Sequence, residues 1–266
     1  MARTYLRYVA LGDSTTEGMH DGDEAGGYRG WADRLAEQLA AADPRVHYAN
    51  LAVRGRETHQ VHAEQLPAAL SLRPDLATVL TGVNDLLRPR FDAVKVAGHL
   101  ESMFAALTGV GARVVGFLLP DPSLMVPAAG GLGRRAHSLN AGVREAADRH
   151  GVTLVDLSVH PVCTDPRLWS PDRLHLNTLG HMRLAAAVAH ALELPGSDAF
   201  WSNPLEPRRK PAMMRRAGIE LHWAASFVGP WLIRRLLGRS SGDGRTAKRP
   251  SLGPVEPPPS DPFSSR

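Results

Sequence analysis

The residue types needed for nucleophilic hydrolysis occur at two distant points of the chain. Ser14 directly follows a short apolar run at 8–11, and far downstream Asp172 precedes His175 by three residues. A serine hydroxyl becomes a useful nucleophile only when a base lies within hydrogen-bond reach and a third group orients that base. The order Ser14, Asp172, His175 therefore predicts a hydrolytic triad. In that triad His175 is the base, and Asp172 holds the imidazole in one tautomer.

An acyl-transfer intermediate also needs hydrogen-bond donors aimed at its developing negative charge. Three donors are predicted for this oxyanion hole: the backbone N–H groups of Ser14 and Gly55 and the side-chain amide of Asn84. Glycine lets the main chain approach a reacting group closely, and an asparagine amide donates without a competing charge. Asp13 and Asp85 are their sequence neighbours. We expect these two carboxylates to order the site by hydrogen bonding and not to react.

The elements that must position these residues alternate along the chain up to about residue 195. Short apolar runs typical of strands occupy 5–11, 46–51, 76–81, 113–119 and 152–156. Helical periodicity occupies 31–42, 58–70, 93–108 and 134–150, and a last helix is expected at 178–192, capped by Thr178. This alternation predicts a parallel sheet covered by helices on both faces. Ligands of such sheets bind beyond the carboxyl ends of the strands, where the candidate residues converge.

The segments that carry these residues resemble the sequence blocks of the SGNH hydrolase family, also called GDSL-type esterases and lipases. Gly12-Asp13-Ser14 is similar to its serine block and Gly55 to its glycine block. Gly82-x-Asn84-Asp85 is similar to its asparagine block, and the Asp172–His175 pair matches its last block. The resemblance covers about residues 5–192, and all four blocks occur in the family's order.

The resemblance implies a flavodoxin-like three-layer α/β/α sandwich around five parallel strands. It also implies hydrolysis of small-molecule carboxylic esters through an acyl-enzyme, with no metal or organic cofactor. Two departures leave the catalytic atoms in place: Thr15 stands where the GDSL motif has leucine, and Arg173 and Leu176 flank the last block. Arg173 brings a cation near the site that would bias the choice of substrate.

The composition changes after residue 195. The last 66 residues hold ten of the 21 prolines, and 201–266 carries 12 Lys and Arg against five Asp and Glu. We predict a hydrolase domain at 1–195, a basic extension with short helices at 196–238 and a largely disordered Pro-rich tail at 239–266. The aromatic segment 213–237 either docks on the hydrolase body or lies on an anionic membrane surface. An alternative function is thus a catalytically silent binding or membrane-peripheral module.

Other features of the sequence limit the setting and the partners. The single cysteine, Cys163, excludes an internal disulfide and fits a reducing compartment. The start of the chain lacks an apolar signal core and no run approaches the length of a membrane span, so a cytoplasmic protein is expected. The basic residues form no recognisable nucleic-acid reading motif. His59 and His62 have a spacing found in metal ligands, but the sequence offers no convincing third ligand.

Loops are expected to set the size of the substrate pocket. They are the segments 19–30, 86–92 and 120–133, and the last is rich in Pro, Gly and small residues. Such a composition is typical of a flexible lid.

Overall fold

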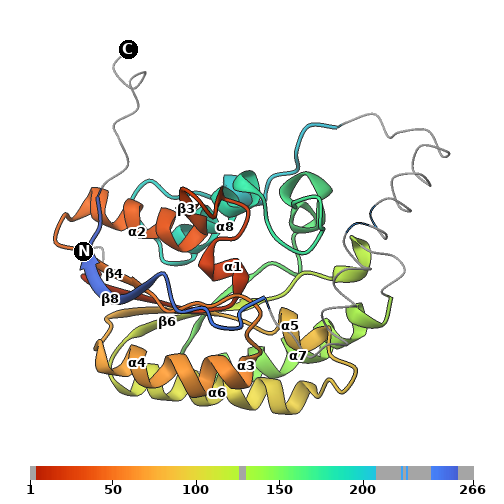
Figure 1. Ribbon diagram of the computed structural model, residues 1–266, viewed down its shortest axis with the longest axis horizontal. Coiled ribbons are helices and arrows are strands. Elements are labelled where there is room, and N and C mark those ends of the chain that lie inside the picture. The colour runs from red at the N-terminus through yellow and green to blue at the C-terminus, as the bar shows by residue number, and fades with distance from the viewer. Residues whose placement is uncertain (1–3, 126–129, 208–222, 224–225, 227–240, 257–266) are drawn as a thin grey trace.

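A six-stranded sheet forms the centre of the computed structural model, which describes residues 4–125, 130–207, 223, 226 and 241–256. The strand order is β7-β6-β5-β1-β4-β8 (Figure 1). The strands are β1 Arg7–Gly12, β4 His47–Asn50, β5 Leu76–Leu80, β6 Arg113–Leu118, β7 Thr153–Asp156 and β8 Arg249–Pro254. All but β8 pair in parallel, in the order of a flavodoxin-like sheet. The predicted fold class is confirmed, with one strand more than expected.

Helices cover both faces of the sheet, α2 and α8 on one side and α3, α4, α6 and α7 on the other (Figure 1). The longer helices are α2 Gly30–Ala42, α6 Ala93–Gly109, α7 Gly130–His150 and α8 Thr178–Ala191. The short ones are α1 Ser14–Glu17, α3 Thr58–Gln60, α4 Leu66–Ser71 and α5 Val83–Leu86. No helix among the described residues is long and apolar enough to cross a membrane.

Smaller elements connect this framework. A short hairpin pairs β2 Gly22–Asp23 with β3 Gly27–Tyr28. Single turns of 3₁₀-helix are η2 Pro122–Leu124, η4 Pro161–Thr164, η5 Pro166–Leu168 and η6 Ala199–Ser202. The expected lid at 120–133 contains η2 and the first turn of α7, and its residues 126–129 lie outside the described part of the chain.

The core follows from the apolar strands. All five residues of β5 are buried, as expected for a parallel strand that is covered on both faces. Trp31 of α2 is fully buried and packs edge-on against Phe117 of β6, with ring centroids 5.3 Å apart. This contact fixes α2, in one of the two helical layers, to the sheet that carries the candidate residues.

The helix expected over 58–70 is interrupted by a π-helical turn, η1, at Val61–Gln65. The turn brings Gln65 against the end of β1. There the backbone N–H of Gly12 donates to Gln65 Oε1, and Gln65 Nε2 donates to the Gly12 carbonyl, both at 2.9 Å. Such single π turns often occur at functional sites. Here the turn fixes the backbone two residues before Ser14.

The expected cap of the last helix is wrong by one residue. The side chain of Asn177 accepts the N–H of Gly180, so Asn177 is the N-cap and Thr178 is the first helical residue. The amide of Asn177 also donates to the carbonyls of Arg167 and Trp169. A threonine hydroxyl cannot make all these contacts at once, which explains why asparagine takes this position.

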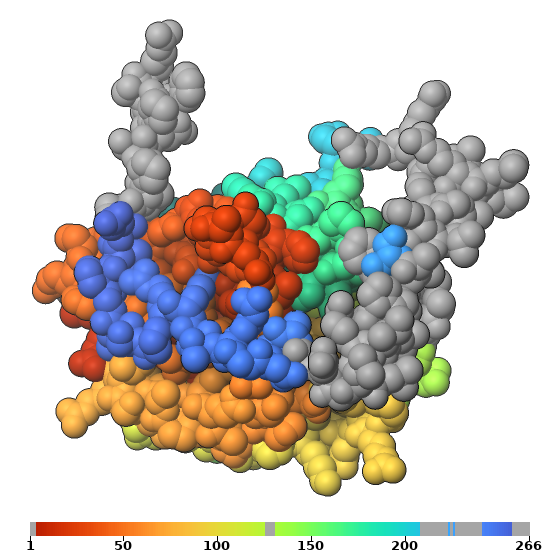
Figure 2. All heavy atoms as spheres, viewed as in Figure 1, coloured from red at the N-terminus to blue at the C-terminus, as the bar shows by residue number. Residues whose placement is uncertain are grey.

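The prediction that the tail 239–266 is disordered is wrong for part of this segment. Residues 249–254 form β8, which pairs antiparallel with β4 and closes an edge of the sheet. The guanidinium of Arg249 lies 5.3 Å from the ring centroid of Tyr48 in β4. Figure 2 shows this segment, in blue, lying across the red and orange surface of the first elements. The helices expected at 213–237 lie outside the described residues, apart from positions 223 and 226.

Lys248 attaches this segment to the region around α1. Its ammonium group contacts the carbonyl oxygens of Glu17 at 2.6 Å, Tyr28 at 2.7 Å and Arg29 at 3.0 Å. It also forms an ion pair with Asp33 of α2 at 2.6 Å. The C-terminal segment therefore holds the end of the helix that begins with Ser14.

Candidate active site

Ser14 is presented by a sharp turn from β1 into α1. A Cβ on Gly12 would lie 2.3 Å from the carbonyl oxygen of Leu80 in the neighbouring strand, so the close approach of the two strands requires glycine. Asp13 is the N-cap of α1 and accepts the N–H of Thr15 at 3.1 Å. The helix ends after one turn at Gly18, whose φ of 99° is left-handed. Ser14 thus stands at the carboxyl end of a central strand.

His175 links Ser14 to Asp172 by hydrogen bonds. Its Nε2 lies 3.0 Å from Ser14 Oγ, and its Nδ1 lies 2.6 Å from Asp172 Oδ2. Because the carboxylate only accepts, the proton of the neutral imidazole is on Nδ1 and the Nε2 lone pair faces the serine hydroxyl. The structure brings together the three residues of the predicted triad in a geometry suited to proton transfer.

Asp172 is held as an anion in a fixed orientation. Its Oδ1 accepts the backbone N–H groups of Leu174 at 3.0 Å and His175 at 3.1 Å. Burial acts to raise the pKa of Asp172, but the hydrogen bonds from His175 and His20 outweigh burial and keep the pKa below its ordinary value. A charged acceptor beside His175 stabilises the imidazolium that forms when the base takes a proton.

A tight loop holds Asp172 and His175. Ser170 donates its N–H to the His175 carbonyl at 2.8 Å, and Arg173 donates its N–H to the Ser170 carbonyl at 2.9 Å. Arg173 has a left-handed backbone with φ of 58°. These two hydrogen bonds close the loop before α8 begins. Residues 172–175 therefore form a turn, which brings Asp172 and His175 together.

The candidate oxyanion donors follow β4 and β5. Gly55 has a φ of 75°, and Asn84 lies on α5, which begins after Gly82. Asn84 Nδ2 donates to the carbonyl of Arg56 at 3.0 Å and lies 3.3 Å from Asp13 Oδ2. The Asn84 amide is therefore fixed between the glycine loop and the serine turn.

Asp13 and Asp85 are buried beneath the site. Asp85 accepts both the backbone N–H and the hydroxyl of Thr58 at 2.9 Å, which joins α5 to α3. Burial, assisted by the negative charges of Asp85 and Glu17, raises the pKa of Asp13 to about 7. Both carboxylates accept hydrogen bonds from backbone or side-chain donors.

A cavity of about 710 Å³ opens beside these groups. Ser14, Gly55, Asn84, Asp172 and His175 all line it. Most of its remaining wall is apolar and comes from Leu87, Leu119, Met125, Leu132, Val162, Leu168, Trp169, Leu174, Leu184, Trp201 and Trp223. A site of this size holds an organic molecule whose reactive group meets a few polar residues at one end.

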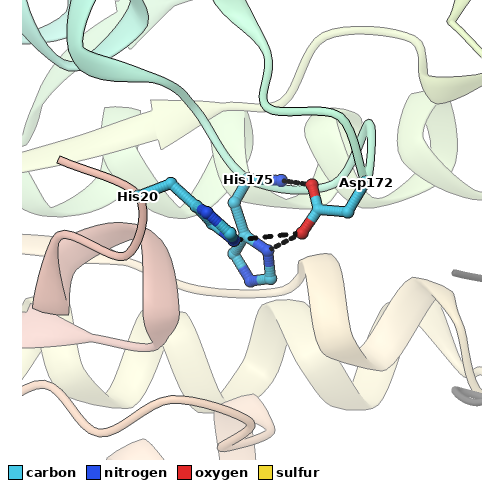
Figure 3. A group of neighbouring side chains, drawn as sticks. All are labelled: His20, Asp172 and His175. Carbon is cyan, nitrogen blue, oxygen red and sulfur yellow. Dashed lines mark hydrogen bonds and ion pairs between the residues drawn. The ribbon is translucent and has the colours of Figure 1, made fainter. Parts of the chain in front are cut away.

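Two residues at the site were not identified from the sequence. His20 Nε2 lies 3.3 Å from Asp172 Oδ2, and its ring lies beside that of His175 with centroids 5.3 Å apart (Figure 3). Trp223 donates its indole N–H to the Asp172 carbonyl at 3.2 Å, and the Arg173 guanidinium lies 4.6 Å from the Trp223 ring. His20 has no motif partner, and its only signal is its place in the 19–30 loop. Trp223 belongs to the segment for which docking was one alternative.

His181 lies near the site but serves the packing of α8. Its Nδ1 accepts the N–H of Trp31 at 3.2 Å, so its Nε2 carries the proton and donates to the Met19 carbonyl at 3.0 Å. Burial lowers the pKa of this fully buried histidine to about 4. The imidazole is therefore neutral and joins α8, α2 and the loop after α1.

The pKa of His181 predicts acid destabilisation. Between pH 6.5 and 4 the unfolded chain binds a proton at this residue and the folded protein does not, so stability falls as the pH falls. We expect His181 to contribute about 2 kcal/mol to the loss of unfolding free energy between pH 7 and pH 5. Urea unfolding at both pH values should show a smaller loss in His181→Gln, which keeps one donor and one acceptor. The exposed His190→Gln on the same helix is the control, and equal losses in the two variants would contradict the assignment.

In the folded structure, His99 lies next to the His59–His62 pair. His62 Nδ1 lies 3.0 Å from His99 Nδ1 of α6, whereas the ring of His59 is 6.4 Å from that of His99. In the described part of the chain, only His20, Asp172 and His175 bring three metal-ligating atoms within 4.8 Å of one another.

Comparison with known proteins finds a family and several solved structures that are similar to this chain. Residues 10–183 match the model of the GDSL-like Lipase/Acylhydrolase family. No curated protein matches the chain. Among solved structures, a catalytic mutant of Axe2, an acetylxylan esterase from Geobacillus stearothermophilus, superposes with a TM-score of 0.62 at 16% identity. That match covers 77% of this chain and 100% of the other.

Two further structures share the fold. The lipase/acylhydrolase from Enterococcus faecalis has a TM-score of 0.58 at 22% identity, covering 77% of this chain and 100% of that one. LAE5, an alpha/beta hydrolase enzyme from the metagenome of Lake Arreo, Spain, has a TM-score of 0.59 at 21% identity. It covers 71% of this chain and 95% of its own.

Proposed function

The chain belongs to the GDSL-like lipase/acylhydrolase family and is an ester-hydrolysing enzyme, and from this premise we propose that Ser14, His175 and Asp172 carry out the hydrolysis. The observation that supports this assignment is the continuous hydrogen-bonded chain from Ser14 Oγ through His175 to Asp172. A nucleophile, a base and an orienting anion in this relation are the requirements of acyl transfer through a serine.

In the proposed reaction, Ser14 Oγ attacks the ester carbonyl carbon while His175 Nε2 takes the hydroxyl proton. The tetrahedral intermediate then collapses. The bond to the alcohol oxygen breaks, and His175 gives its proton to the leaving alcohol. A water molecule, deprotonated by His175, then attacks the acyl-enzyme; the bond between the acyl carbon and Ser14 Oγ breaks, His175 returns the proton to Oγ, and the carboxylic acid leaves. Asp172 keeps the imidazole in the productive tautomer throughout.

The oxyanion of both intermediates is proposed to lie between three donors: the N–H of Ser14, the N–H of Gly55 and Nδ2 of Asn84. Asn84 Nδ2 directs its two N–H groups at the Arg56 carbonyl, 3.0 Å away, and at Asp13 Oδ2, 3.3 Å away, so the oxyanion replaces the longer contact with Asp13 while Arg56 keeps the amide oriented. A donor that is already oriented costs little reorganisation when charge develops, which is why such donors contribute strongly to the rate.

Asn84→Ala is expected to lower kcat by about 10²–10³-fold with little change in KM, because the amide acts mainly on the charged intermediate. Steady-state hydrolysis of a p-nitrophenyl ester measures both constants. Circular dichroism and urea unfolding should confirm an intact fold. A kcat within threefold of the wild-type value would remove Asn84 from the oxyanion hole.

The apolar cavity favours esters with a hydrophobic chain as substrates. Each methylene that the cavity buries contributes up to about 0.8 kcal/mol, or roughly a fourfold gain in kcat/KM. Rates on p-nitrophenyl esters from acetate to palmitate should therefore rise from acetate to medium chains. Acetylated xylooligosaccharides are the comparison substrate, since Axe2 is described as an acetylxylan esterase. Highest activity on acetate or on the acetylated sugar would contradict this preference.

Covalent labelling tests the nucleophile without any assumption about the substrate. A fluorophosphonate reacts with an activated serine, so mass spectrometry of the digested protein should find the adduct on Ser14. Prior unfolding in urea should prevent labelling, because the adduct depends on the assembled base. An adduct at another serine would assign the nucleophile there.

A further inference from the structure

His20 places a second imidazole against the carboxylate of the proposed triad. It lies in the loop that follows the Ser14 helix, and its own φ of 68° is left-handed. Its side chain is 41% exposed, whereas those of Asp172 and His175 are 16% and 14% exposed. Figure 3 shows the rings of His20 and His175 directed at the same oxygen, Asp172 Oδ2. The proposed reaction does not use His20.

The three side chains form a donor set suited to zinc. Each of His20, His175 and Asp172 offers one ligand atom, a ring nitrogen or a carboxylate oxygen, and these atoms lie within 4.8 Å of one another. Two imidazoles and one carboxylate, with a fourth position left for water, are a common tetrahedral set for Zn²⁺. Because His20 is partly exposed, an ion from solvent has a path to the set. We propose that this cluster is an inhibitory Zn²⁺ site built on the triad.

The distances from Asp172 Oδ2 to the two imidazoles are close to those of a tetrahedral zinc site. Ligand atoms at about 2.0–2.1 Å from a tetrahedral zinc lie about 3.3 Å from one another. His20 Nε2 and Asp172 Oδ2 are already 3.3 Å apart. His175 Nδ1, now 2.6 Å from Asp172 Oδ2, must move away by about 0.7 Å. The ion then takes the place of the proton between them.

Hydrogen bonds from neighbouring groups hold Asp172 and His175 in place. Asp172 Oδ1 is held by two backbone N–H groups, which turns Oδ2 toward the two imidazoles. Trp223 holds the Asp172 carbonyl, and Ser14 Oγ contacts the far nitrogen of His175. Partners of this kind fix ligand orientation at metal sites and strengthen metal binding.

Zinc at this place would block the reaction through the tautomer of His175. A metal on Nδ1 takes the lone pair there, so the single proton of the neutral imidazole moves by exchange with solvent from Nδ1 to Nε2, with no net release. The neutral, metal-bound imidazole then carries its proton on Nε2, which faces Ser14 Oγ as a donor. It no longer accepts the serine proton, so Ser14 loses its base. This inhibitory consequence rests on the proposed function, whereas the binding of zinc does not.

Calorimetry tests the site without enzymatic activity. The full-length Ser14→Ala protein, whose replaced hydroxyl is not a ligand, is titrated with ZnCl₂ in a non-chelating buffer. We expect one equivalent to bind, with affinity reduced at least about tenfold by adding His20→Ala. Adding His99→Ala, which removes a histidine from the separate His62–His99 contact, should leave this equivalent unchanged. Unchanged binding after His20→Ala, loss after His99→Ala, or no binding in the parent would each overturn the proposal.

Inhibition measurements test whether zinc at this site blocks ester hydrolysis. ZnCl₂ should inhibit ester hydrolysis by the wild type, and EDTA should restore it. Each variant is compared with its own zinc-free rate, and His20→Ala and His20→Gln should both need at least about tenfold more zinc for half-inhibition. His99→Ala should be inhibited like the wild type. Equal sensitivity of the His20 variants would overturn the inhibitory site. Should the protein hydrolyse no ester, the proposed function fails, and calorimetry still decides whether the zinc site exists.

Discussion

Ser14→Ala is expected to reduce ester turnover by about 10³–10⁶-fold, down to the rate that binding and the oxyanion donors sustain without a nucleophile. The change removes one oxygen, which contacts only His175 Nε2 among the hydrogen bonds of the described residues. The fold should therefore be unaffected. Initial rates on a p-nitrophenyl ester, measured at high enzyme concentration, cover this range.

Thr15→Ala is the matched control for Ser14→Ala. Thr15 carries the neighbouring hydroxyl on the same helical turn, and its contact with Asp13 is made by the backbone N–H, which alanine retains. We expect this variant to keep most of the wild-type rate. Turnover that survives in Ser14→Ala at a comparable level would show that another residue is the nucleophile.

Asp172→Asn is expected to lower kcat by about 10⁴-fold while leaving KM nearly unchanged. The amide nitrogen would occupy a position that now accepts from His175 Nδ1 at 2.6 Å. An N–H facing Nδ1 forces the proton of the imidazole onto Nε2, so the base is lost although the geometry is kept. Steady-state kinetics measures the loss, and a crystal structure of the variant would verify the position of the ring.

Asp148→Asn removes the same charge from an exposed position on α7 and serves as the control. It should change kcat by less than twofold, since a distant surface charge is screened by salt. If both variants lost activity equally, or if Asp172→Asn kept more than a tenth of the wild-type kcat, Asp172 would not be the orienting group.

The sequence was sufficient to predict the parallel sheet and the convergence of the site. Each predicted strand is an apolar run, and each candidate residue lies in the segment that follows a strand or precedes the last helix. In a parallel sheet this order alone places Ser14, Gly55 and Asn84 at one edge. The roles of these residues in catalysis remain proposals, which the variants above test.

The sequence was not sufficient to predict β8. Its residues include Pro250, Gly253 and Pro254, which are rare inside strands and typical of disordered tails. Proline is tolerated there because β8 lies at the edge of the sheet, where half of the backbone groups have no partner strand. We propose that 241–256 belongs to the hydrolase domain in spite of its composition.

His20 could not be predicted for another reason. Its partners lie more than 150 positions away, and no local sequence pattern indicates such a contact.

The attachment of Lys248 has a consequence for how the protein folds. Its contact with the Glu17 carbonyl joins residues 231 positions apart, so the loop that it closes spans most of the chain. Contacts of such long sequence separation form late, because the entropy of closing the loop must be overcome before the contact stabilises anything. During synthesis, the serine turn therefore stays without this support until the chain as far as Lys248 has left the ribosome. Catalytic competence should accordingly be among the last properties that the refolding chain acquires.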